Sequence, residues 1–179
     1  MDTTEMQAIM EAIIYVAEEP VKPEQFQEIF PKQEKENIEQ ALKTMVDAFN
    51  ARPGGLCIRE VAGGYRMTTR PEHHEQIRAY LKTRPNAKLS MAALETLAVV
   101  AYKQPVTMAE VLAIRGKKSS SALHTLLEKN MVAIVGRKQV VGRPILYGTS
   151  KQFLIHFGLN SLKDLPTLEE FAQLASEQL

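Results

Sequence analysis

The sequence predicts an α+β fold, mainly helical, built from two tandem winged-helix (helix-turn-helix) domains. Three observations lead to this prediction: apolar residues recur at helical spacing, a strand–turn–strand pattern follows the third helix of each half, and the two halves share one apolar register. The chain has 179 residues, of which 45% are hydrophobic and 24% are charged. These proportions are typical of an ordinary globular protein and exclude a wholly disordered one.

The first half of the chain is predicted to hold three helices, a hairpin and one further helix. Each of the first three helices carries an apolar stripe at i, i+3, i+4 spacing and is followed by proline or glycine. The third is the most clearly amphipathic, with glutamate and lysine opposite its stripe. The expected elements are helices over Met6–Ala17, Phe26–Phe30 and Ile38–Phe49, strands over Leu56–Val61 and Tyr65–Thr69, and a helix from Pro71 to Leu81.

The second half repeats this order. Ser90 is a candidate helix cap, and Thr107 with Glu110 forms a capping-box pattern in which each side chain accepts from an amide at the start of a helix. Asn130 suits the left-handed position that ends a third helix. The expected elements are helices over Ser90–Ala101, Thr107–Ile114 and Ser119–Leu127, strands over Met131–Val135 and Ile145–Thr149 around a basic turn, and a short helix over Phe153–Phe157.

An internal repeat supports two copies of one architecture. Shifting the first half by 85 positions aligns the apolar residues of three helices without a gap, so that Phe26 meets Val111 and Leu42 meets Leu127. We therefore expect an N-terminal winged-helix domain over residues 1–84, a C-terminal one over 85–158, and a partly helical or flexible tail over 159–179. The tail contains a second capping-box pattern at Thr167–Glu170 with an apolar stripe of Leu168, Phe171, Leu174 and Ala175.

The residues that usually carry catalysis or bind metal are sparse. The single cysteine, Cys57, excludes an intramolecular disulfide and a cysteine-rich zinc module, and it lies in a predicted strand. The four histidines (His73, His74, His124 and His156) have no acidic residue at a spacing that indicates a metal or acid–base site. We expect no catalytic residue, cofactor or metal. No apolar run approaches the roughly 18 residues of a membrane helix, so a cytoplasmic protein with no membrane partner is expected.

Positive charge is concentrated in one segment of the chain. The net charge is only +1, with −2 over residues 1–88 and +3 over 89–179, but Arg115–Lys151 holds eight basic residues and one acid. The cations expected to allow weak, non-specific DNA contact are Arg115, Lys117, Lys118 and Lys138. The third helix of the second half offers Ser119, Ser120, Ser121, His124 and Thr125, yet lacks the Arg, Asn or Gln that best discriminate bases. A DNA-binding transcriptional regulator is therefore an alternative function for this chain. A further alternative for the basic segment is a cationic face that contacts only solvent.

The second half resembles the segregation and condensation protein B family, whose members are bacterial condensin subunits with two winged helices. The matching residues are Leu89–Ala98, Ala101–Thr107, Ile114–Gly116, Leu126–Glu128, Val135–Lys138, Gly142–Thr149, Phe153-Leu154 and Phe157–Pro166. In the first half the likeness is weaker and rests on Ile13 and Ala17–Pro20. The segment Lys117–Ser121 departs from the more acidic helix entrance expected of that family.

The resemblance implies a non-enzymatic role in chromosome condensation and segregation during cell division. It implies a homodimer formed largely through the N-terminal domain, and binding of the kleisin subunit (segregation and condensation protein A type) through the C-terminal domain. The kleisin would link the protein to the chromosome-maintenance ATPase and so to the nucleoid. Because tyrosine and arginine often anchor interfaces, we expect partner binding by Tyr102, Lys103, Arg137, Arg143 and Tyr147. Core packing is the alternative for the two tyrosines, and a solvated wing is the alternative for the two arginines.

Overall fold

The computed structural model describes residues 2–81, 89–116, 119–167 and 170, which form two compact units. The N-terminal unit consists of residues 1–85 together with 158–179, and the C-terminal unit consists of residues 86–157. The chain therefore passes from one unit to the other twice. The domain boundary predicted between residues 84 and 85, like the predicted apolar stripe of the tail, lies outside the described residues.

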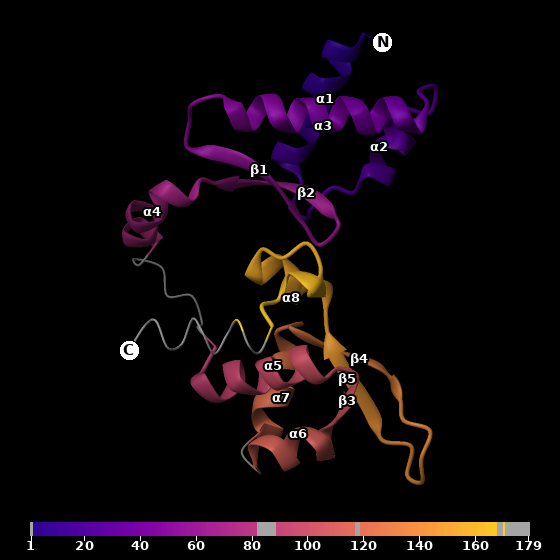
Figure 1. The fold of residues 1–179 in the computed structure, drawn as a ribbon, viewed down its shortest axis with the longest axis vertical. Helices are drawn as coiled ribbons and strands as arrows, with labels where there is room; N and C mark the ends of the chain where they lie inside the picture. The colour runs from indigo at the N-terminus through magenta and orange to yellow at the C-terminus, as the bar shows by residue number, and fades with distance from the viewer. Residues whose placement is uncertain (1, 82–88, 117–118, 168–169, 171–179) are drawn as a thin grey trace. The chain divides into compact units, whose positions relative to one another are not determined.

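The N-terminal unit places three helices on a hairpin (Figure 1). Helices α1 (Thr3–Val16), α2 (Pro23–Ile29) and α3 (Lys35–Ala51) precede strands β1 (Leu56–Val61) and β2 (Gly64–Thr69). The strands pair antiparallel from Leu56 opposite Thr69 to Val61 opposite Gly64. A short 3-10 turn η1 (Pro71–His73) and helix α4 (His74–Leu81) follow, and no side chain of α4 is buried.

The predicted apolar stripes of these helices form the core of the N-terminal unit. The fully buried side chains come from each of the three helices and from the hairpin: Met10, Ile14, Phe26, Ile38, Leu42 and Ile58. Burying one such side chain stabilises the fold by about 1.5–3 kcal/mol. Val21, between α1 and α2, exchanges two backbone hydrogen bonds of 2.9 and 2.8 Å with Tyr65 and so ties the helices to β2.

The C-terminal unit has the same order of elements around a small sheet. Helices α5 (Met91–Lys103), α6 (Met108–Arg115) and α7 (Ser119–Glu128) gather beside strands β4 (Val132–Arg137) and β5 (Ile145–Thr149), and helix α8 (Lys151–Phe157) follows (Figure 1). A third strand, β3 (Val106–Thr107), gives the sheet order β3-β5-β4. Strand β3 was not predicted, because two residues are too few to show a strand period.

The helix ends of the C-terminal unit form as the sequence predicts. The Ser90 hydroxyl accepts from the Ala93 amide at 3.2 Å, and the Thr107–Glu110 capping box is present in both directions. Asn130 has a φ of 54°, the left-handed conformation expected after α7. The core is formed by residues of all three helices and α8, including Val100, Val111, Leu123, Leu126 and Phe153. Each unit is a winged helix, so the predicted fold class is confirmed.

The segment after α8 is bound to the hairpin of the N-terminal unit. The Ala62 amide donates to the Leu159 carbonyl at 2.9 Å, and the Gly63 amide donates to Asn160 Oδ1 at 2.7 Å. The Asn160 amide group in turn donates to Glu60 at 2.9 Å. Because Ala62 and Gly63 form the β1–β2 turn at φ values of 53° and 73°, this segment supplies acceptors for both turn amides.

Candidate partner-binding surface

The structure brings two of the predicted residues, Arg137 and Arg143, together on the wing of the C-terminal unit. The wing is defined here as β4, β5 and the turn between them, residues 132–149. Arg137 ends β4, and its guanidinium donates to the Arg143 carbonyl at 3.2 Å. Both side chains are exposed, and neither forms an ion pair with a carboxylate in the described part of the chain. The wing therefore carries two uncompensated positive charges side by side.

The wing also exposes apolar side chains that the sequence analysis did not single out. Ile134 is 60% exposed, Val135 54% and Val141 fully exposed, with Val140 beside it. Ile134 lies opposite Tyr147 and Gly136 opposite Leu146, so Val135 is an extra residue in a β-bulge. Two features of the sequence indicate this exposed apolar surface. The pair Val140-Val141 lies inside an otherwise polar turn, and the apolar residues of β4 are consecutive instead of alternating.

The second pair of predicted residues, Tyr102 and Lys103, lies at the end of α5. Both are exposed, and the next residue, Gln104, fixes this end of α5 to β5. Gln104 Oε1 accepts from the Thr149 amide at 2.8 Å and from its hydroxyl at 3.1 Å. A Cβ on Gly148 would lie 2.9 Å from that same oxygen, so a larger residue there would displace it.

The two pairs of residues lie at opposite ends of the sheet and do not form one cluster. Gln104 holds α5 at Thr149, which pairs with Val132, whereas Arg137 pairs with Ile145. Four residues along β5 correspond to about 13 Å. Tyr147, between these ends, is only 7% exposed and pairs with residues of both β3 and β4. Its ring is therefore part of the core and offers no surface to a partner.

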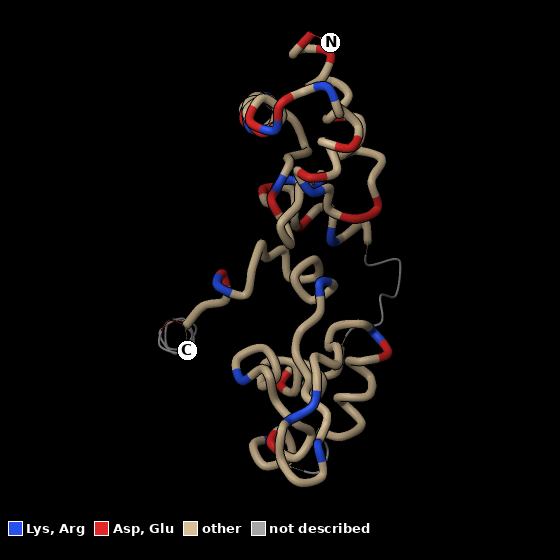
Figure 2. Tube along the Cα trace, turned by 90° about the vertical axis from the view of Figure 1, so that its right-hand side faces the viewer, with Lys and Arg blue, Asp and Glu red and all other residues tan. Residues whose placement is uncertain are grey.

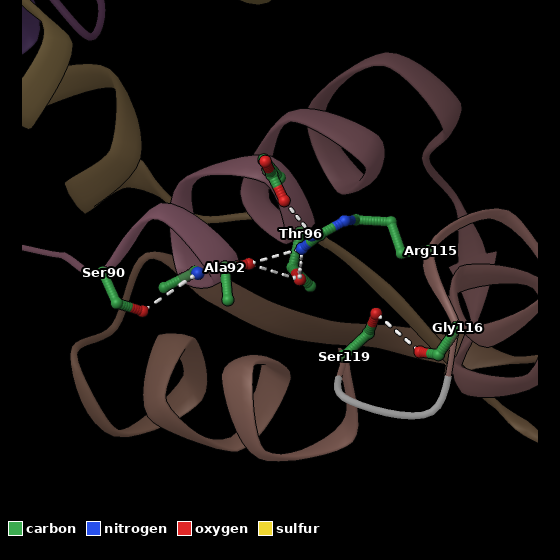
Figure 3. Close-up of polar contacts among 8 residues, drawn as sticks. Ser90, Ala92, Thr96, Arg115, Gly116 and Ser119 are labelled. Carbon is green, nitrogen blue, oxygen red and sulfur yellow. Dashed lines mark hydrogen bonds and ion pairs between the residues drawn. The ribbon is translucent and has the colours of Figure 1, made fainter.

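Arg115, predicted to contact DNA, instead joins α6 to α5 (Figure 3). One guanidinium nitrogen donates to the Ala92 carbonyl at 2.7 Å and to the Thr96 hydroxyl at 3.1 Å, and the other pairs with Glu95. The Thr96 hydroxyl is completely buried and donates to the same carbonyl at 2.8 Å. These contacts occupy the guanidinium and give Arg115 a structural role, while its contact with DNA stays a prediction.

The other residues predicted to contact DNA are less available than the sequence suggested. Ser119 is 1% exposed, and its hydroxyl donates to the Gly116 carbonyl at 2.9 Å, so it cannot contact a phosphate (Figure 3). Lys138 forms an ion pair of 2.6 Å with Glu110, which compensates its charge. Lys117 and Lys118 lie outside the described residues.

Glu110 is held in its charged form by three hydrogen bonds. The Lys138 ammonium, the Thr107 amide and the Thr107 hydroxyl donate to its carboxylate at 2.6–2.8 Å. These contacts, with that of Lys138 the largest, lower the pKa of Glu110 from 4.5 to about 2. The pair thus connects the start of α6 to the wing.

The N-terminal unit has an apolar groove between α1, the end of α3 and the hairpin. Its volume is about 440 Å³, and its lining residues are Ala8, Glu11, Ala12, Tyr15, Phe49, Arg52, Leu56 and Met67. Arg52 and Glu11 form an ion pair of 3.0 Å at this groove, and the Arg52 guanidinium lies 3.6 Å from the centre of the Phe49 ring. Tyr15 is 69% exposed, so the groove presents apolar surface whose neighbouring charges are balanced.

No cluster of catalytic or metal-binding character is found in the part of the chain that the structure describes. Within those ranges, no group of three or more His, Cys, Asp or Glu side chains is placed to hold a metal ion. Cys57 is buried, with its sulfur 3.3 Å from the Thr68 hydroxyl. None of the described helices combines the length and the apolar character needed to cross a membrane.

These features define a protein of two winged-helix domains whose prominent surfaces are an apolar groove and a basic wing. Comparison with known proteins identifies the family. The sequence model of the family "Segregation and condensation complex subunit ScpB" matches residues 8–168, and the chain belongs to this family. The resemblance seen in the sequence is thereby confirmed, and the chain is a member of a family of chromosome segregation and condensation proteins.

The curated relatives match over almost the whole chain. Segregation and condensation protein B of Syntrophotalea carbinolica is 45% identical over 177 residues, which cover 99% of this chain and 89% of the relative. That of Alkaliphilus metalliredigens is 39% identical over 179 residues, covering 100% of this chain and 94% of the relative. The crystal structure of ScpB from Mycobacterium tuberculosis is 33% identical, covers 89% of this chain and 98% of that chain, and superposes with a TM-score of 0.42.

Replacing Arg115 by lysine tests its structural role. Lysine keeps the positive charge but cannot reach Ala92, Thr96 and Glu95 with a forked head, so the free energy of unfolding should fall by about 1–3 kcal/mol. Arg143→Lys, at an exposed position of the same unit, is the matched control and should change stability by less than about 0.5 kcal/mol. Urea denaturation measures both variants, and equal stabilities would contradict the structural role.

The Glu110–Lys138 pair should give the C-terminal unit a defined pH dependence. Since folding lowers the pKa of Glu110, its contribution to stability is complete above about pH 4.5 and is lost as the pH falls toward about 2. The difference in stability between the wild type and Glu110→Gln should therefore become smaller as the pH falls from about 4.5 to about 2. Thermal unfolding between pH 2 and 7 measures it, with Glu128→Gln as a control for loss of one negative charge. A difference that stays constant with pH would refute the role of this pair.

Proposed function

We propose that the protein is a non-enzymatic subunit of the bacterial structural-maintenance-of-chromosomes (condensin) complex. It forms a homodimer through the N-terminal unit and binds the kleisin subunit through the C-terminal unit. Through the kleisin it reaches the chromosome-maintenance ATPase and takes part in chromosome condensation and segregation during cell division. Its place is the cytoplasm, in association with the nucleoid through the complex. The observation that carries the proposal is the uncompensated Arg137–Arg143 pair on the wing of a chain that belongs to this family.

Opposite charges on the two units support a division of roles. The C-terminal unit has ten basic and three acidic side chains, a balance of +7, whereas the N-terminal unit has twelve basic and eighteen acidic ones, a balance of −6. Figure 2 shows the acidic positions in red mainly along the N-terminal unit. An acidic kleisin segment would be attracted to the C-terminal unit, which favours fast, salt-sensitive association.

The residues proposed to contact the kleisin are Arg137 and Arg143 on the wing, with Tyr102 and Lys103 as a second contact at the end of α5. All four side chains are exposed. Because the two contacts are about 13 Å apart along the sheet, a partner that touches both must extend across it. Tyr147 supports this surface from within the core and does not take part directly.

A DNA-binding transcriptional regulator is less well supported. The outward positions at the start of α7 are Ser120, Ser121 and His124, which give little discrimination between bases. Arg115 is engaged with α5 and Lys138 is compensated by Glu110, so fewer cations remain for phosphates. Any DNA contact of the C-terminal unit should therefore be weak, independent of sequence and lost at physiological salt.

The groove of the N-terminal unit is the proposed dimer contact. Two copies of an apolar surface can cover one another in a symmetric dimer, and Tyr15 with Leu56 would be buried in it. The ion pair of Glu11 and Arg52 keeps the local charge near zero, so the surface does not repel its copy.

The double variant Arg137→Glu/Arg143→Glu should lose the kleisin. Reversing two neighbouring charges repels an acidic segment, and we expect the affinity to fall by about tenfold or more, equivalent to about 1.4 kcal/mol. Co-purification and titration with the kleisin encoded by the same genome measure it.

The matched control is Lys32→Glu/Lys43→Glu, which makes the same change in net charge on exposed side chains of the N-terminal unit. It should bind as the wild type does. If both double variants bound the kleisin normally, this partner surface would be wrong.

Tyr15→Glu should convert the dimer into a monomer. Burying an unpaired carboxylate in an apolar contact is unfavourable by several kcal/mol or more. Light scattering after size exclusion should give twice the 20.1 kDa chain mass for the wild type and the single mass for the variant. Tyr80→Glu, at a similarly exposed tyrosine of α4, is the control and should stay dimeric. A monomeric wild type would disprove the dimer, and an unchanged Tyr15 variant would disprove this contact.

A further inference from the structure

Strand β4 is an edge of the sheet in the C-terminal unit. In the order β3-β5-β4, it pairs with β5 on one side, and no described strand pairs with its other side. Its six residues extend over about 20 Å. An edge strand presents backbone donors and acceptors that an additional strand can satisfy. The length is sufficient for a short extended segment of another chain.

The side chains along this edge have a distinct order of charge and apolar character. The middle of β4, from Ala133 to Gly136, holds no charge, and Ile134 and Val135 are more than half exposed there. Both ends are basic: Lys129 and Lys151 lie near the Val132 end, where Glu128 is the nearest acid in sequence, and Arg137 and Arg143 lie at the other end. Lys138 is set apart from this group by its ion pair with Glu110.

We propose that an extended segment of a partner protein adds to β4 as a further strand of the sheet. The segment that fits has apolar side chains in its middle, against Ile134 and Val135, and carboxylates toward both ends, against the cations. This inference rests on the proposed function, in which that segment belongs to the kleisin. The backbone hydrogen bonds of strand addition supply affinity, and the side-chain order supplies specificity.

Charge disfavours a second copy of the same strand as the occupant. If two β4 strands paired antiparallel about Ile134 and Val135, Arg137 of one copy would approach the Val132 end of the other, where Lys129 and Lys151 lie. Like charges placed opposite one another across strands are destabilising. An acidic segment meets the opposite situation, because each of its ends would face a cation.

Duplex DNA also fits this edge poorly. Its phosphates match the arginines, but they leave Ile134, Val135 and Val141 exposed to water between the cations and provide no strand partner. Unpaired apolar edges favour aggregation, and proteins limit that risk with bulges and charged residues. The bulge at Val135 and the terminal arginine Arg137 are such features, so pairing is restricted to a strand whose charges compensate them.

Hydrogen exchange of the full chain, alone and with the purified kleisin, tests strand addition. Kleisin binding should slow hydrogen exchange of those amides of residues 132–137 that point away from β5 by about tenfold or more. The exchange rates of the amides of α7 should not change. In parallel, Ile134→Lys should weaken kleisin binding by about tenfold or more, whereas His124→Lys, an equal charge added at an exposed position of α7, should bind within about twofold of the wild type.

Each outcome separates this inference from the proposed function. If the kleisin binds but β4 exchanges at its original rate and Ile134→Lys binds normally, strand addition is wrong and kleisin binding stands. If no complex forms, the proposed function fails and takes the inference with it. Protection of β4 that rises with the concentration of the chain alone would identify a second copy as the occupant, and protection by duplex DNA in place of the kleisin would identify a nucleic-acid surface. Either result would overturn the proposal.

Discussion

Three short helices can cover only part of a β-hairpin, and this constraint determines which apolar surface each unit leaves exposed. In each unit the apolar stripes of the helices pack against part of the hairpin, where Ile58 of β1 and Val132 of β4 are buried. Two other apolar side chains of the same strands, Leu56 and Ile134, remain exposed because the helices do not extend over them. Exposed apolar surface next to a strand is therefore a direct consequence of the small winged-helix fold, and each unit surrounds it with different charges.

The charge separation between the units becomes clear only when the chain is divided by its folding. Cutting the sequence after residue 88 gives −2 and +3, whereas the two units carry −6 and +7. The difference arises because residues 158–179, with four acids and one lysine, belong to the N-terminal unit, and because residues 86–88, with one lysine, belong to the C-terminal unit. Asn160 reaches the β1–β2 turn across 97 residues of sequence, a contact that no local pattern reveals.

Local patterns predicted the elements well because helices and hairpins obey short periods. The stripe of α3, the Ser90 cap and the left-handed Asn130 are all decided by residues within a turn or two. Three features were not predictable in this way: the two-residue strand β3, the role of Arg115, and the groove beside Tyr15. Each depends on residues far apart in the sequence, such as Arg115 and Ala92, which are 23 positions apart.

The basic segment shows why residue type alone cannot assign a binding role. Arg115, Lys138 and Arg137 lie within one cationic stretch and look equivalent in sequence. In the fold, Arg115 donates hydrogen bonds to the buried Thr96 and to a backbone carbonyl, and Lys138 forms an ion pair with Glu110. Of the three, only Arg137 keeps a charge that no carboxylate compensates. On a surface with few uncompensated cations around apolar residues, charge speeds association with a partner. The lifetime of the complex then depends on apolar contacts and backbone pairing. Such a surface suits a protein partner in a long-lived complex better than a polyanion, which is bound through many phosphates.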